Sequence, residues 1–129
     1  MSDGIVGGAP RVFLRIEGAA LLACATAAYA WFGQPWWVFA VLLLAPDLSV
    51  LGYIAGPGAG AILYNALHTV TPPLIGLSAA IILGQPWLVG LALIWLAHIG
   101  LDRMLGYGLK YGSGFGNTHL GVIGRGART

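Results

Sequence analysis

The sequence predicts an all-α membrane protein, folded as a four-helix transmembrane bundle. Hydrophobic residues make up 58% of the 129 residues and charged residues only 8%, and the mean hydropathy is +0.84. A soluble domain carries roughly 25% charged residues, whereas lipid solvates an apolar surface that lacks them. Four apolar stretches near the length of a membrane span support the prediction. The alternative is a soluble chain buried in a large complex.

The boundaries of the spans follow from turn signals. A helix needs about 20 apolar residues to cross roughly 30 Å of hydrocarbon. Two Gly-Gln-Pro turns, at Gly33–Pro35 and Gly84–Pro86, and a glycine-rich break at residues 56–60 divide the apolar sequence. The predicted spans cover about residues 12–32, 36–54, 61–83 and 86–105. Residues 1–110 would form the membrane domain and residues 111–129 a glycine-rich cytoplasmic tail.

The basic residues predict the orientation. They lie before the first span or at and beyond the end of the fourth, and both Gly-Gln-Pro turns are uncharged. Four spans return the chain to its starting side, so the positive-inside rule places both termini in the cytoplasm. The predicted location is the cell (inner) membrane. The basic residues form no continuous stripe, which argues against nucleic-acid binding; they are Arg11, Arg15, Arg103, Lys110, Arg125 and Arg128.

An internal repeat indicates that the bundle consists of two similar helical hairpins. The motif Gly-Gln-Pro-Trp occurs at residues 33–36 and again 51 positions later, at residues 84–87. The same shift aligns Glu17 with His68 and aligns Asp47 with His98. Each hairpin has two spans, so the pseudo-two-fold axis would run along the membrane normal. The alternative is that one convenient turn motif occurs twice.

Each predicted span carries one main ionisable residue, and these four residues share one depth. Glu17 and His68 each lie 16 residues before the glycine of a Gly-Gln-Pro turn. Asp47 and His98 each lie 12 residues after the proline of such a turn. At about 1.5 Å per residue, all four would lie roughly 18–24 Å from the outer turns. The sequence therefore predicts a polar layer in the cytoplasmic half of the bilayer.

This layer has the composition of a transition-metal site. Asp102 lies four residues after His98, on the same helical face. Buried charges in a membrane must pair, protonate or bind a cation, and two imidazoles favour zinc, manganese or iron over calcium or magnesium. The predicted metal ligands are Asp47, His68, His98 and Asp102, with Glu17 as a further ligand or general base. The alternative is a structural or proton-linked network of paired side chains without metal.

Other polar residues near this layer are candidates for supporting roles. Asn65 lies three residues before His68, on the same face, where it would orient a ligand or the substrate. His119, in the tail, would fold back over the mouth of the site; the alternative is an exposed tail histidine. Arg103 and Lys110, beside glycine-rich backbone, would attract an anionic lipid headgroup.

Several of these segments carry a family resemblance. The chain resembles the bacterial membrane family filed as domain of unknown function 4260, over about residues 11–125. The resemblance implies a four-span membrane protein and no established activity. A fainter likeness, resting on a few His, Asp and Thr-His positions, is to integral-membrane metal-dependent hydrolases. The segments that carry the family resemblance are Ala45–Ser49, Gly52–Tyr53, Ala55–Pro57, Tyr64–His68, Trp95–Arg103, Gly106–Tyr111 and Thr118–Gly121.

Three classes of function fit these residues. The first is a metal-dependent hydrolase acting on a lipid-like substrate through a metal-bound water. The second is a small proton- or ion-coupled transporter, acting as a homo-oligomer, since intramembrane His and carboxylate groups also serve such pathways. The third is a structural subunit in which the polar layer packs the helices. No Gly-x-Ser-x-Gly motif is present, which argues against a serine hydrolase.

Overall fold

The computed structural model describes residues 4–110 and 117–122. Within them, four helical segments are long and apolar enough to cross a membrane: Gly8–Phe32, Trp36–Ala55, Pro57–Ile82 and Pro86–Leu105. The predicted four-span helical fold is therefore confirmed. Two spans are single helices, and the other two are each broken in the middle. The elements are α1 Gly8–Phe32, α2 Trp36–Leu42, η1 Ala45–Ala55, α3 Pro57–His68, α4 Thr71–Ile82, α5 Pro86–Leu105, β1 Asn117–Thr118 and β2 Gly121–Val122.

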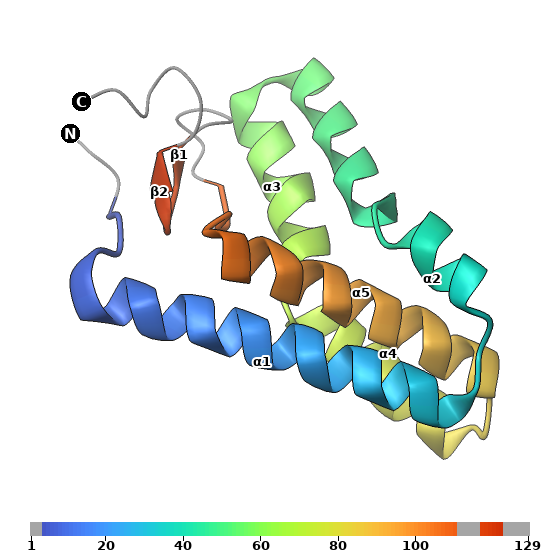
Figure 1. The fold of residues 1–129 in the computed structure, drawn as a ribbon. Helices are drawn as coiled ribbons and strands as arrows, with labels where there is room; N and C mark the ends of the chain where they lie inside the picture. Colours follow the sequence, from blue (N-terminus) through green and yellow to red (C-terminus); the bar gives the residue numbers. More distant parts are fainter. Residues whose placement is uncertain (1–3, 111–116, 123–129) are drawn as a thin grey trace.

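Helix α5 forms the centre of the bundle (Figure 1). Helices α1 and α4 pack against it, while η1 packs against α3. More than half of the apolar window of α5 is buried, whereas most residues of the other spans face outward. Large apolar side chains such as Trp31 and Ile54 are almost fully exposed, as expected for helices that lipid surrounds.

Glycines bring α1 and α5 into close contact. A Cβ atom at Gly100 would lie 2.6 Å from the Leu22 nitrogen and 2.7 Å from the Gly18 carbonyl oxygen. A Cβ atom at Gly18 would lie 2.5 Å from the Cβ of Arg103. Small residues allow such backbone approach, which is a principal source of helix association in membranes. This crossing fixes α1 beside the part of α5 that carries the polar residues.

The third span is broken just before its two prolines. It begins at Pro57, four residues earlier than predicted, and α3 ends at His68, with α4 starting at Thr71. Pro72 has no N–H to donate to the His68 carbonyl, so a continuous helix would leave that acceptor without its partner. The Arg103 side chain donates to this carbonyl at 3.4 Å instead. The break places His68 at a helix end.

The second span, predicted over about residues 36–54, is an α-helix followed by a 3₁₀-helix. Pro46, at the start of η1, interrupts the hydrogen-bond ladder. The Asp47 N–H then donates to the Leu44 carbonyl at 3.0 Å, not to Leu43, its acceptor in an α-helix. The tighter winding turns Asp47 towards the centre of the bundle.

The two Gly-Gln-Pro turns share one backbone feature. Gly33 and Gly84 both adopt a left-handed conformation, with φ of 68° and 64°, which glycine tolerates at a helix end. At the first turn, the Tyr29 hydroxyl donates to the Pro35 carbonyl at 2.6 Å. The matching turns agree with the repeat, but the duplication of the hairpins remains a prediction.

The described part of the tail forms a small hairpin, β1–β2, in a segment predicted to be loop-like. It lies beside the start of α1 and the end of α5 (Figure 1). The Arg11 side chain donates to the Leu120 carbonyl at 2.6 Å, and Arg15 donates to the Met104 carbonyl at 2.9 Å. The first helix thus holds the tail in place. Arg125 and Arg128 lie outside the described residues.

Candidate metal centre

Four polar side chains meet where η1, α3 and α5 come together. They are Asp47 from η1, His68 from the end of α3, and His98 and Asp102 from α5. One ligand atom from each lies within 4.8 Å of all the others. All four predicted metal ligands are therefore gathered in one group, which could hold a metal ion.

The distances within the group are short and nearly uniform. The two Nε2 atoms of His68 and His98 lie 3.0 Å apart. Asp47 Oδ1 lies 3.3 Å from the His68 Nε2 and 3.2 Å from the His98 Nε2. Asp102 Oδ2 lies 3.6 Å and 3.2 Å from the same two atoms. The donors converge on one point instead of forming two separate pairs.

Five of the six spacings lie close to those of a tetrahedral metal site. Zinc bonds to imidazole nitrogen and carboxylate oxygen at about 2.0–2.2 Å, which gives a tetrahedron with edges of about 3.3–3.6 Å. Five donor–donor distances in the group span 3.0–3.6 Å. The sixth, between the Asp47 and Asp102 carboxylates, is within 4.8 Å, so the four donor atoms surround a point at which a small cation could be held.

The backbone of α3 orients His68. Its Nδ1 lies 2.8 Å from the Tyr64 carbonyl oxygen, which can only accept, so Nδ1 carries the proton. The Nε2 lone pair of the neutral ring then faces the group. A ligand histidine in metal sites commonly donates its other nitrogen to a carbonyl in this way. The Tyr64 ring also stacks on the His68 ring at 3.7 Å between centroids, which restricts ring rotation.

His98 is the most buried member of the group. Its exposed fraction is 1%, and Asp102 accompanies it one helical turn away. The Leu43 carbonyl, at the break in the second span, interacts with the His98 ring. Within the described residues, however, Nδ1 has no partner in hydrogen-bond geometry. The buried His98 Nε2 therefore faces His68, Asp47 and Asp102, and among the described residues its ring lacks a second hydrogen-bond partner that would fix it.

The group has one open side. The Asp47 side chain is 51% exposed and that of Asp102 is 16% exposed, whereas both imidazoles are buried. A water or a substrate atom would therefore reach the group past Asp47. On the basic side, Lys110 Nζ lies 4.6 Å from the centre of the Tyr64 ring. Burial lowers the pKa of Lys110, and the charges of Asp102 and Asp47 act in the opposite direction.

Glu17, the predicted further ligand or general base, is not part of this group. It is exposed on α1, and its carboxylate acts electrostatically on Arg103. Its neighbour Gly18 packs against Arg103 and Met104. Glu17 therefore lies nearer the basic end of the bundle than the four ligands, on the outside of α1.

Asn65 holds the tail rather than the four-residue group. Its Nδ2 donates to the Lys110 carbonyl at 2.6 Å, and its Oδ1 accepts from the Lys110 N–H at 2.6 Å. This paired contact engages both ends of the side-chain amide. In the described structure, Asn65 thus positions Lys110 over the Tyr64 ring, near the charges of Asp102 and Asp47.

Replacing Asn65 by alanine is expected to release Lys110 from the bundle. Two hydrogen bonds to buried backbone groups are lost, which should weaken the docking of the segment by about 1–3 kcal/mol. Hydrogen exchange at the Lys110 amide measures this directly. Asn65→Asp keeps the acceptor for the Lys110 N–H but sets a second acceptor against the Lys110 carbonyl, so it should also lose protection. Equal protection in the wild type and in Asn65→Ala would contradict the positioning role.

His119 is fixed beside Leu109, in the tail hairpin. Its Nδ1 accepts from the Leu109 N–H at 2.8 Å, and its own N–H donates to the Leu109 carbonyl at 3.0 Å. Burial, and then the Arg103 charge, lower the pKa of the imidazole, with the Leu109 backbone offsetting this in part. His119 therefore packs the tail against the basic end of the bundle, opposite Leu109 and next to the bridge between Lys110 and Thr118.

The docking of His119 is expected to weaken as the pH falls. Its folded-state pKa lies below the value of about 6.5 in an unfolded chain, so the undocked tail binds more protons. The stabilisation is present above about pH 6.5 and is lost as the pH falls below that value. Exchange of the Leu109 amide, corrected for its intrinsic rate, should therefore accelerate in acid. His119→Gln should remove this dependence, and an unchanged dependence in that variant would disprove the assignment.

Two features of the site were missed from the sequence. Tyr64 stacks on His68, and Lys110 covers Tyr64, which forms a layered support for one ligand. The spacing of four residues between Tyr64 and His68 places them on one helical face, and this spacing was an available signal. The approach of Lys110 depends on the fold of the tail, for which no local pattern exists.

The fold and the four-residue group define a multi-pass membrane protein with a polar centre that could bind a metal ion. The chain belongs to the family described as a domain of unknown function (DUF4260), which matches residues 11–123. This match confirms the family resemblance seen in the sequence, whereas the fainter likeness to membrane hydrolases gains no support. Comparison with curated proteins and with solved structures found no match.

Proposed function

We propose that this protein is a membrane-embedded metalloenzyme that hydrolyses a lipid-like substrate. The proposed metal is a divalent transition ion, zinc first and manganese or iron as alternatives, held by Asp47, His68, His98 and Asp102. The observation that carries the proposal is the convergence of the four donor atoms, with five separations of 3.0–3.6 Å. Two imidazoles with two carboxylates neutralise such an ion and suit its ligand preference.

The proposed chemistry uses the exposed side of the centre. A bound divalent ion lowers the pKa of a coordinated water to about 7, which supplies a nucleophile at neutral pH. Asp47, as the most exposed ligand, would loosen to admit that water and would accept its proton. Attack on an ester carbonyl or phosphoryl group would release an alcohol and an acid. Glu17, on the outside of α1, takes no part in this step.

The orientation of the protein is part of the proposal. The positive-inside rule places the end that carries Arg11, Arg15, Arg103 and Lys110 at the cytoplasmic face of the cell (inner) membrane. Arg103 and Lys110 would then contribute positive charge beneath anionic lipid headgroups there, with Lys110 itself buried against the Tyr64 ring. A homo-oligomer is compatible with the exposed apolar faces of the helices.

The proposal is tested by assaying the purified protein in phospholipid vesicles, after loading with zinc. Mass spectrometry should detect a hydrolysed lipid that accumulates with metal and disappears with a chelator. Asp102→Asn removes a ligand charge with little change in volume and should abolish the reaction. If the wild-type protein is fully loaded with metal but forms no more hydrolysed lipid than Asp102→Asn does, the hydrolase proposal is wrong.

A transporter is the second candidate, and the two broken spans favour it. Transporters commonly bind ions where interrupted helices expose backbone groups near the membrane centre. Here the breaks at Leu43–Leu44 and Thr69–Val70 adjoin the ligands Asp47 and His68. Flux of zinc or protons into vesicles, lost in His68→Ala, would support this function over hydrolysis.

A further inference from the structure

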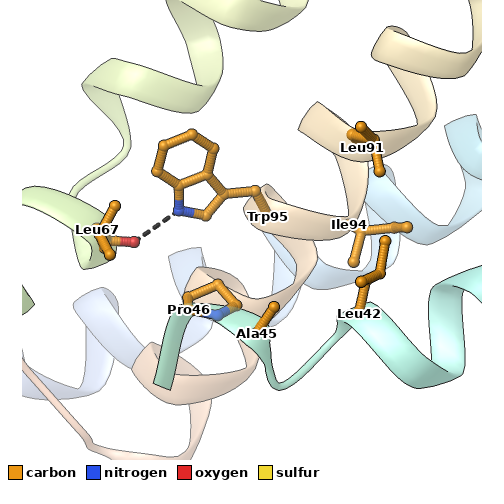
Figure 2. A pocket seen from close by; sticks show the side chains of 7 residues that line it. All are labelled: Leu42, Ala45, Pro46, Leu67, Leu91, Ile94 and Trp95. Carbon is orange, nitrogen blue, oxygen red and sulfur yellow. Dashed lines mark hydrogen bonds between the residues drawn. The ribbon is translucent and has the colours of Figure 1, made fainter. Parts of the chain in front are cut away.

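An apolar groove runs along the outer side of the candidate metal centre. Its volume is about 280 Å³, and its walls come from α2, η1, α3 and α5 (Figure 2). Every lining side chain is apolar apart from the indole nitrogen of Trp95. The residues that line it are Leu42, Ala45, Pro46, Leu67, Leu91, Ile94 and Trp95.

The groove adjoins two of the candidate ligands directly. Pro46 precedes Asp47, and Leu67 precedes His68, so two lining residues are chain neighbours of residues in the centre. On α5, Trp95 lies three residues before His98, about one helical turn away. The groove therefore lies near the polar centre, and none of the four residues of the centre is part of its lining.

The lining of the groove offers no free side-chain donor to bind water. Trp95 Nε1 donates to the Leu67 carbonyl at 2.6 Å, and Figure 2 shows the indole nitrogen pointing at that oxygen. Leu67 lies at the end of α3, before the prolines that interrupt the third span. Because this hydrogen bond uses the only side-chain donor in the lining, the groove favours hydrocarbon over water.

The groove and the basic residues lie on opposite sides of the centre. Leu91, Ile94 and Trp95 precede His98 on α5 and so lie towards the outer turns. Arg103 and Lys110 follow it, at the basic end. A lipid whose headgroup meets the basic end would therefore extend its chain past the centre and into the groove. The basic end, the polar centre and the apolar groove thus follow the same order as the headgroup, the ester and the acyl chain of such a lipid.

We propose that this groove binds one acyl chain of an anionic glycerophospholipid from the leaflet at the basic end. The carboxylic ester of that lipid then lies beside Asp47, at the open side of the centre. This assignment rests on the proposed function for the role of the lipid as substrate. The proposed substrate is therefore an acyl ester whose chain lies in the groove while its headgroup lies at the basic end.

The test is photo-crosslinking in vesicles that contain phosphatidylglycerol with a diazirine in one acyl chain. Labelling of residues 42–46 and 91–95 should exceed labelling of equally exposed residues on α1 several-fold. Ala45→Trp fills the groove and should reduce this labelling several-fold, as should Leu91→Phe in a second position. Ala23→Trp is the matched control, because Ala23 is an exposed alanine at similar depth on α1, and it should leave the groove labelling unchanged.

Metal content, measured on the same samples, separates the two proposals. Even labelling of all lipid-facing helices, or unchanged labelling in both groove variants, would indicate surrounding lipid only and would overturn the groove assignment. If metal is bound in those samples, the metal centre survives this result. Strong groove labelling in a protein that binds no metal would instead overturn the metalloenzyme and leave a lipid-binding groove.

Discussion

Replacing His98 by alanine is expected to abolish metal binding. The His98 Nε2 lies 3.0–3.2 Å from the donor atoms of His68, Asp47 and Asp102, so its loss removes one corner of the site. Changes outside the ligand set typically weaken metal affinity about 10–100-fold, so the loss of a ligand should exceed about 100-fold. Competition with a chromophoric zinc chelator measures this affinity in detergent.

The matched control for this variant is His119→Ala. It removes an imidazole from the same chain, but His119 binds the Leu109 backbone and lies outside the group of four. Its zinc affinity should remain close to that of the wild type. Equal affinity in the wild type and in His98→Ala would show that the ion binds elsewhere, whereas equal losses in both variants would point to the tail.

Replacing Gly100 by leucine is expected to disrupt the packing of α1 on α5. A Cβ atom at Gly100 already overlaps backbone atoms of Leu22 and Gly18, which cannot rotate away as a side chain can. Overpacking commonly costs about 1–3 kcal/mol, and a clash with backbone should exceed about 3 kcal/mol. The change in the free energy of unfolding is measured by denaturation in mixed micelles.

Gly76→Leu provides the control for the crossing. Gly76 also lies within a helix, but a Cβ atom there meets nothing within 4 Å. That variant should keep or slightly raise the free energy of unfolding, because glycine is a poor helix former. If both leucine variants were equally stable, α1 and α5 would not cross at Gly100.

The sequence was sufficient to predict the spans and the four residues that the structure gathers in one group. Lipid-facing helices depend mainly on hydropathy and length, which are local properties. Asp47, His68 and His98 could be grouped because a regular rise along a helix converts residue spacing into depth. Asp102 could be added to this group because it lies one helical turn beyond His98.

The rest of the site required the packed structure. Depth alone does not tell which way a side chain points, and Glu17 shares a predicted depth with the ligands while lying on the exposed side of α1. Pro46 marks an interruption of the second span, but the local sequence does not show that all of η1 winds as a 3₁₀-helix or that it packs against α3. The contact of Asn65 with Lys110 joins residues 45 positions apart, and such long-range contacts have no sequence signal.

X-ray absorption spectroscopy of the zinc-loaded protein tests the central claim most directly. The account predicts four nitrogen or oxygen neighbours at about 2.0–2.2 Å, with outer-shell scattering from two imidazole rings that falls to one ring in His68→Ala. A spectrum without imidazole scattering, or a protein that retains no zinc after gel filtration, would contradict the metal centre. Asp47, His68, His98 and Asp102 would then form a metal-free network that packs the helices.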